Sequence, residues 1–193
     1  MSHTLYHYVH CPYCVRVRMA CGYLNIPYKS IVLSYDDEET PVALSNKKML
    51  PIMKSSNGIM NESLDIIKVL DKKNALNLEH YFDRKEEIDK LLKEIGRSVH
   101  SLCMPYWIFT AEFDSKARKY FQDKKEVSKG PFSKLVEQKD YFLKELKSVL
   151  KREEKNIENF YLTKDLDILD IVLSSHLWGM FVYPDFQFDD DLQ

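Results

Sequence analysis

The sequence predicts an α/β domain at the N-terminus followed by an all-helical domain. In the first third, short strand-like apolar runs alternate with helical patterns, whereas every later apolar repeat has helical spacing. Between these two parts, residues 74–83 lose periodicity. We therefore expect the α/β domain at residues 1–73, a linker at 74–83 and the helical domain at 84–193.

The first domain is predicted to begin with a strand at Leu5 to Val9, a helix from Pro12, and a second strand at Tyr28 to Leu33. A polar turn then leads to a short helical segment. Asn57-Gly58 is a strong hairpin signal between strands at residues 52–54 and 59–61. A helix from Ser63 to about Lys72 completes the order βαβαββα.

Apolar stripes at helical spacing predict the helices of the second domain. The first stripe runs from Ile88 to Tyr106, and the second from Phe132 to Leu150. A third stripe, from Leu166 to Met180, belongs to a helix expected to begin near Thr163.

Composition favours a soluble intracellular protein. The 45% hydrophobic residues suffice for a core, and 28 Lys and Arg nearly cancel 30 Asp and Glu, so no overall charge favours nucleic acid or membrane partners. The start of the chain resembles no secretory signal, and no run approaches the roughly 18 apolar residues of a membrane span. Four cysteines are too few for a disulfide scaffold. We expect a monomer in the cytoplasm.

Cys11-Pro12-Tyr13-Cys14 place two thiols one helical turn apart, where a strand gives way to a helix. A thiolate at a helix N-terminus lies among unpaired N–H groups and the positive end of the helix dipole, so the pKa of Cys11 should fall. Pro12 suits the first helical turn. Cys11 is expected to be the exposed thiol and Cys14 the enclosed one. This arrangement indicates a thioredoxin-like redox motif.

The other sulfur and imidazole groups do not suggest a metal site. A structural zinc site needs a second Cys-x-x-Cys or a His pair, whereas Cys21 and Cys103 lie singly on apolar stripes and are expected in the core. On a strand His3 and His7 share a face that His10 does not, so we expect surface or edge residues. No metal is expected.

Three further features are ambiguous when taken singly. Leu50-Pro51 precedes a strand, and because only about one X-Pro bond in twenty is cis, the sequence alone does not support a cis bond. Glu62-Ser63 opens a helix, which suits either carboxylate binding or a plain cap. Lys47-Lys48 suit either a second carboxylate or solubility alone.

The cysteine motif and several longer stretches of the sequence match one known family. The tetrad Cys11-Pro12-Tyr13-Cys14 is that of dithiol glutaredoxins, and the chain resembles the large bacterial glutaredoxin 2 family to about residue 182. The matching stretches are Arg18-Met19, Asn25-Ile26-Pro27, Asp37-x-Glu39-Thr40-Pro41, Leu50-Pro51-Ile52, Glu62-Ser63-x-Asp65-Ile66 and a run from Ala117 to Gly130.

The resemblance implies a thioredoxin-fold domain joined to a helical domain, as in glutathione transferases. It implies an enzyme, a dithiol glutaredoxin that uses glutathione as co-substrate to reduce glutathione mixed disulfides and protein disulfides. Cys11 and Cys14 are then catalytic. Tyr13 flanks the nucleophile, Pro51 is cis, and the Leu50 backbone pairs with the cysteinyl part of glutathione. Glu62 and Ser63 hold the γ-glutamyl end, and Lys48 meets the glycine carboxylate.

The chain departs from the family pattern near its end. The helix expected near Thr163 has Leu166 where a capping acid often stands, so its capping signal is incomplete. The chain also ends at Gln193, earlier than the pattern implies, which predicts a short or absent final helix.

The main alternative is a glutathione transferase that conjugates electrophiles, suggested by the two-domain layout and by Tyr6 and Tyr8 near the bound thiol. The cysteine pair argues against it, because a nucleophilic cysteine would trap glutathione as a disulfide. A non-enzymatic protein on the same fold and an iron-sulfur bridged dimer are further alternatives without separate support in the sequence.

Overall fold

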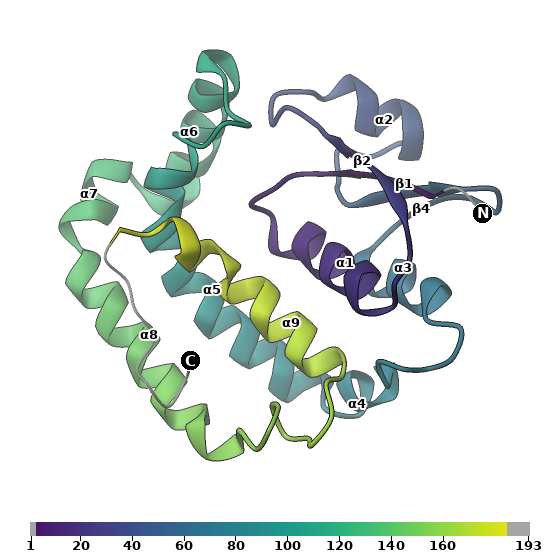
Figure 1. The fold of residues 1–193 in the computed structure, drawn as a ribbon. Coiled ribbons are helices and arrows are strands. Elements are labelled where there is room, and N and C mark those ends of the chain that lie inside the picture. The colour runs from purple at the N-terminus through teal and green to yellow at the C-terminus, as the bar shows by residue number, and fades with distance from the viewer. Residues whose placement is uncertain (1–2, 185–193) are drawn as a thin grey trace.

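The structure is a computed structural model, which describes residues 3–184 (Figure 1). Its first part follows the predicted order: β1 (His3–His7), α1 (Pro12–Tyr23), β2 (Tyr28–Val32), α2 (Glu39–Ser45), β3 (Ile52–Ser55), β4 (Gly58–Asn61) and α3 (Ser63–Leu70). The four strands form one sheet in the order β2-β1-β3-β4, in which β1 and β2 are parallel and the other pairs antiparallel. The first strand lies two residues earlier than expected, because His7 is its last residue in register with β2.

The second part contains only helices. They are α4 (Leu78–Asp83), α5 (Lys85–Trp107), α6 (Ser115–Lys129), α7 (Phe132–Glu137), α8 (Lys139–Glu153) and α9 (Ile168–Leu177), with 3-10 turns at Glu154–Asn156 and Trp178–Val182 (η2). The thioredoxin-like and helical architecture predicted from the sequence is confirmed by this arrangement and by related structures described below. Helix α4 lies inside the segment expected to be a linker. Its single turn buries Leu78 and Tyr81, too few residues to produce a visible period.

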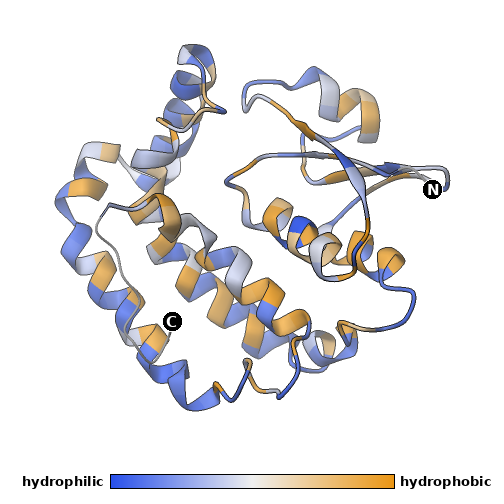
Figure 2. Ribbon diagram, viewed as in Figure 1, coloured by the Kyte–Doolittle hydropathy of each residue, from blue (hydrophilic) through white to orange (hydrophobic). Residues whose placement is uncertain are grey.

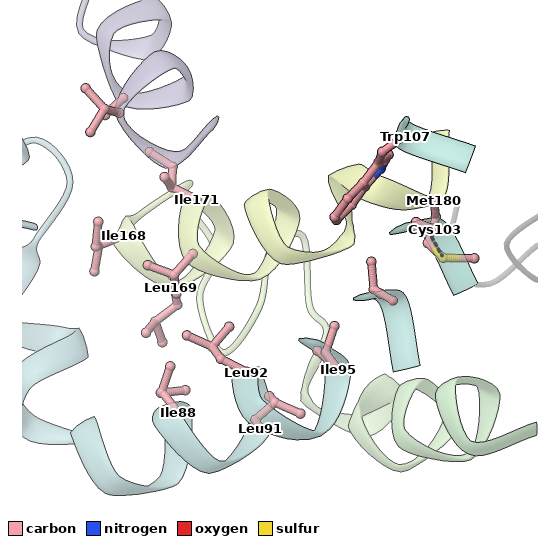
Figure 3. Close-up of a cluster of buried hydrophobic side chains, with 14 of the residues drawn as sticks. Ile88, Leu91, Leu92, Ile95, Cys103, Trp107, Ile168, Leu169, Ile171 and Met180 are labelled. Carbon is pink, nitrogen blue, oxygen red and sulfur yellow. Dashed lines mark hydrogen bonds between the residues drawn. The ribbon is translucent and has the colours of Figure 1, made fainter. Parts of the chain in front are cut away.

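One apolar core joins the two parts. Helix α1 packs against α9, which in turn packs against α5, and these helices lie side by side in Figure 1. Figure 2 shows orange, hydrophobic segments along these helices, and many of their apolar residues belong to one buried cluster. Figure 3 shows Ile88 and Leu92 of α5 near Leu169 of α9. Because one continuous cluster contains residues of both parts, burial of apolar surface holds the domains together.

The two remaining cysteines lie in this core as expected. Cys21 and Cys103 are buried. The Cys103 thiol contacts the Met180 sulfur at 3.5 Å, which connects α5 with η2 (Figure 3). Both residues therefore act as small hydrophobes.

Helix α9 begins at Ile168, and the expected start near Thr163 is wrong. Asp167 is the N-cap and accepts a hydrogen bond from the Leu169 N–H at 2.7 Å, while Asp170 accepts from the Asp167 N–H at 3.0 Å. The Asp170 N–H also donates to the Asp167 side chain, so Asp167 and Asp170 form a complete capping box. The capping signal is incomplete at Thr163 and Leu166 but complete four residues later, where Asp167 and Asp170 occupy the two positions.

No helix within residues 3–184 has the length and apolar character needed to cross a bilayer. The expectation of a short or absent final helix concerns in part residues 185–193, which lie outside the described residues.

Candidate active site

The two motif cysteines occupy the start of α1. Cys11 is the N-cap in extended conformation, and its carbonyl accepts hydrogen bonds from the N–H groups of Cys14 at 3.0 Å and Val15 at 2.9 Å. Pro12 lies in the first turn, where its missing N–H costs no helical hydrogen bond. Cys14 is fully buried and Cys11 is partly exposed. Both thiols are free, so the structure describes the reduced pair.

The environment makes the two thiols electrostatically unequal. The pKa of Cys11 is lowered to about 7, mainly by a hydrogen bond from the Cys14 thiol and to a smaller extent by the N–H groups of Cys14 and Tyr13 and the charge of Lys125, against the opposing effect of burial. Burial raises the pKa of Cys14 well above its usual value. The Tyr8 N–H also points at the Cys14 sulfur at 3.4 Å. Near neutral pH, Cys11 is thus a partly ionised thiol beside the protonated thiol of Cys14.

The Leu50–Pro51 peptide bond is cis, as the family resemblance implied. Leu50 packs in a small buried cluster with Cys14 and Ile52, and Cys11 packs against the same cluster. The chain therefore brings the Leu50 backbone next to the redox pair, just before β3 begins.

The start of α3 lies near the same helix. Glu62 is the N-cap with φ 72° and ψ 109°, and its side chain makes no cap hydrogen bond. Ser63 is buried, and its hydroxyl accepts a hydrogen bond from Arg16 Nη1 at 3.2 Å. The free Glu62 side chain and the unpaired N–H groups of α3 leave donors and acceptors for a ligand.

Arg16 is a site residue that sequence reasoning missed. It is 3% exposed, its guanidinium lies 5.1 Å from the centre of the Tyr13 ring, and its Nε has no hydrogen-bond partner. The available signal was a charge between Val15 and Val17 on the buried side of α1. A buried cation with an unsatisfied N–H is costly unless a further partner approaches it.

Lys48 lies on the side of the site that faces the helical part. Its ammonium donates to Glu38 Oε1 at 2.9 Å and contacts the Tyr120 hydroxyl of α6 at 2.8 Å. The Tyr120 hydroxyl also donates to Glu38. The predicted carboxylate-binding lysine is therefore already engaged by an anion and by a residue of α6.

The helical part supplies contacts that the sequence did not indicate. His176 of α9 meets the Tyr13 ring edge-on, with centroids 5.7 Å apart. His10 lies among aromatic rings with centroids 5.1 to 5.8 Å away, which belong to Tyr8, Tyr35, Trp107, Phe113 and Phe121. The residue that precedes Cys11 is thus packed against α5 and α6.

The expectation that His7 and His10 lie at the surface is wrong. His7 is buried and its Nε2 hydrogen bonds with the Ser30 hydroxyl at 2.7 Å, and His10 is buried by rings distant in the sequence. Burial lowers the pKa of both imidazoles. Within residues 3–184, no three or more His, Cys, Asp or Glu residues lie close enough together to hold a metal ion.

Comparison with known families divides the chain at a similar point. The family described as glutathione S-transferase, N-terminal domain, matches residues 5–78. The family described as glutaredoxin 2, C terminal domain, matches residues 87–193, which is more than half of the chain.

Individual relatives carry both parts together. Glutaredoxin 2 of Escherichia coli strain K12 is 38% identical over 157 residues, which cover 79% of this chain and 73% of the relative. The structure of glutaredoxin 2 from Salmonella typhimurium in complex with glutathione has a TM-score of 0.83 and 29% identity, over 98% of this chain and 88% of that one. A glutathione S-transferase of Ceriporiopsis subvermispora in complex with glutathione has a TM-score of 0.80 at 16% identity, over 95% and 87%. This last likeness shows the fold alone.

Proposed function

This chain belongs to the glutaredoxin 2 family and is a glutathione-dependent thiol-disulfide oxidoreductase, and we propose that Cys11 is the nucleophile of its reaction. The observation that carries this assignment is the unequal thiol pair: Cys11 is partly exposed with a pKa of about 7, and the buried Cys14 donates a hydrogen bond to it. Glutathione is the co-substrate.

The first step transfers glutathione to the protein. The Cys11 thiolate attacks the glutathione sulfur of a mixed disulfide, and a Cys11–glutathione disulfide forms as the bond to the partner sulfur breaks. The partner leaves as a thiolate and takes a proton from water. A second glutathione thiolate then attacks the glutathione sulfur on Cys11, which releases glutathione disulfide and restores the Cys11 thiolate.

Protein disulfides require the second cysteine. After Cys11 attacks a protein disulfide, Cys14 resolves the resulting mixed disulfide, and a Cys11–Cys14 bridge forms that two glutathione molecules reduce. Cys14 gives up its proton in this step. The raised pKa of the buried Cys14 keeps it protonated until Cys11 has reacted.

We assign glutathione to the surface beside the pair. The Leu50 backbone before cis-Pro51 is the partner for the cysteinyl unit, and Tyr13 flanks the nucleophile. Glu62 and Ser63 at the start of α3 take the γ-glutamyl end, with Arg16 holding the Ser63 hydroxyl. Lys48 takes the glycine carboxylate and exchanges Glu38 for it.

We also propose glutathionylated and disulfide-bonded proteins as substrates, a monomer as the active form and the cytoplasm as the location. Residues of both parts of one chain surround Cys11, so the site needs no second copy. A reducing compartment supplies the glutathione that the cycle consumes.

The test is reduction of a glutathione mixed disulfide by wild type, Cys11→Ser and Cys14→Ser at one glutathione concentration. Cys11→Ser should lose activity, whereas Cys14→Ser should retain much of it, because the glutathione route needs one protein sulfur. Full activity in Cys11→Ser would refute the assignment.

The transferase alternative shares the fold and the neighbouring tyrosines, whereas the unequal thiol pair favours the redox chemistry. Side-by-side assays with a mixed disulfide and an aromatic electrophile separate the two chemistries. Dominant conjugation would contradict the redox function.

A further inference from the structure

Two lysines on the inner side of α6 have no acidic partner among the residues that the structure describes. Lys125 and Lys129 are half-buried one turn apart, and no carboxylate of residues 3–184 lies within ion-pair distance of either ammonium. The other lysines of α6 are engaged: Lys116 pairs with Asp36, Lys119 with Asp123, and Lys124 contacts the Tyr120 hydroxyl. We call Lys125 and Lys129 the inner lysines.

The inner lysines lie on the side of α6 that faces the nucleophile. The Lys125 ammonium is 5.6 Å from the Phe121 ring centre and 5.8 Å from that of Tyr35. Both rings contact His10, the residue before Cys11, with centroids 5.5 and 5.8 Å away. The charge of Lys125 also acts on Cys11, whose pKa it lowers.

The surroundings of the inner lysines are cationic or neutral. Burial and the charges of Lys125 and Arg97 lower the pKa of Lys129, and burial lowers that of Lys125. His100 of α5 is kept neutral by burial, which together with nearby positive charges lowers its pKa to about 3. Within residues 3–184, neither ammonium group forms an ion pair with a carboxylate. Such partly desolvated, unpaired charges cost free energy in the free protein, and a bound anion would repay part of it.

The reaction supplies a suitable anion. Each turnover needs two glutathione molecules, and the surface assigned above accounts for the one bonded to Cys11. The second must bring its thiolate to the glutathione sulfur on Cys11, and the charge of Lys125 on α6 acts at this cysteine. The α-carbon of its γ-glutamyl unit bears both a carboxylate and an ammonium, whereas no ammonium lies beside its glycine carboxylate. A group of cations without an acid repels that ammonium and thus selects the glycine carboxylate.

We propose that Lys125 and Lys129 bind the glycine carboxylate of the second glutathione, the molecule that regenerates Cys11. This inference rests on the proposed function and adds a binding site from the helical domain to it. The bonds are those already given: the new disulfide joins the two glutathione sulfurs, the Cys11–sulfur bond breaks, and the attacking thiol loses its proton to water.

The experiment separates the two half-reactions by stopped flow. The first is formation of the Cys11–glutathione adduct from the mixed disulfide of glutathione and 2-mercaptoethanol. The leaving group, 2-mercaptoethanol, carries no carboxylate or ammonium. The second is reduction of the preformed adduct by glutathione in a Cys14→Ser background, where no internal thiol competes. Lys129→Gln is the test variant because Lys125 contributes to the lowered pKa of Cys11 and its loss would change the nucleophile as well. Lys119→Gln is the matched control on the outer side of α6.

Lys129→Gln should slow the second half-reaction about 3- to 10-fold, as expected for the loss of one half-buried charge contact. The first half-reaction should stay within about twofold, and Lys119→Gln should change neither. With wild type, glutathione esterified at glycine should react more slowly than glutathione, since the ester offers no glycine carboxylate. With the ester as reductant, wild type and Lys129→Gln should react equally fast. Lys129→Arg should restore the preference.

Three results would overturn the proposal. A loss confined to the first half-reaction would place the lysines at the first glutathione instead. An equal loss with the ester would mean that they act without the glycine carboxylate, and an unchanged second half-reaction would mean that they do not bind it. Failure of the wild type to form the Cys11 adduct would instead refute the proposed function itself.

Discussion

Cys11 owes its acidity mainly to one neighbouring side chain. The Cys14 thiol donates a hydrogen bond that favours the Cys11 thiolate, and this is the largest cause of the fall in the pKa of Cys11 to about 7. The N–H groups at the start of α1 contribute less. The helix start was predictable from the tetrad, but the burial that orients Cys14 toward Cys11 depends on residues around Leu33 and Leu50.

We therefore predict that Cys14→Ala raises the pKa of Cys11 toward the value of a free thiol. Cys14→Ser should raise it less, because a hydroxyl can still donate a hydrogen bond. The pH dependence of alkylation by iodoacetamide, or of thiolate absorbance, measures this pKa. An unchanged midpoint in Cys14→Ala would show that the helix N-terminus alone sets the reactivity.

At the scale of elements, the start of α9 depends on a single buried aspartate. Asp167 caps the helix, and its second oxygen lies 2.6 Å from His80 Nδ1 of α4. The same side chain thus joins two helices that are far apart in the sequence. The strength of this joint was not predictable, because no local pattern connects residue 80 with residue 167.

Asp167→Ala should lower the free energy of unfolding by about 1–3 kcal/mol, through loss of the cap and of a buried hydrogen-bond acceptor. Urea unfolding at neutral pH measures the change. Asp165→Ala, an exposed aspartate two residues earlier, is the control and should stay within about 0.5 kcal/mol of wild type. Equal stability of both variants would contradict the role of the capping box.

At the scale of the whole molecule, the two parts meet beside the cysteine motif. His176 of α9 touches Tyr13 of the motif, and Lys48 near β3 contacts Tyr120 of α6. Burial and the charge of Arg16 lower the pKa of His176 to about 4, so this contact is made by a neutral ring. In the unfolded chain the same imidazole takes up a proton below its ordinary value of 6.5.

The sign of the pH effect follows from these two values. Above pH 6.5 both states hold His176 neutral, whereas between 6.5 and about 4 only the unfolded state is protonated, so stability falls as the pH falls. His176→Gln should flatten the plot of unfolding free energy against pH in this window by about 1.4 kcal/mol per pH unit. Urea titrations at several pH values test this. Parallel curves for the two proteins would mean that His176 is protonated in the fold.

The sequence by itself determined local features: the order of strands and helices in the first part, the hairpin at Asn57-Gly58, and the position of the Cys11 thiol at the start of a helix. These depend on periodicity, turn chemistry and backbone N–H groups, which act over a few residues. Tertiary structure decided which distant side chains meet that thiol. It buried His10 among rings of α5 and α6, joined Arg16 to Ser63 and turned Lys125 toward Cys11. Such contacts arise from packing between elements far apart in the chain, which no local pattern encodes.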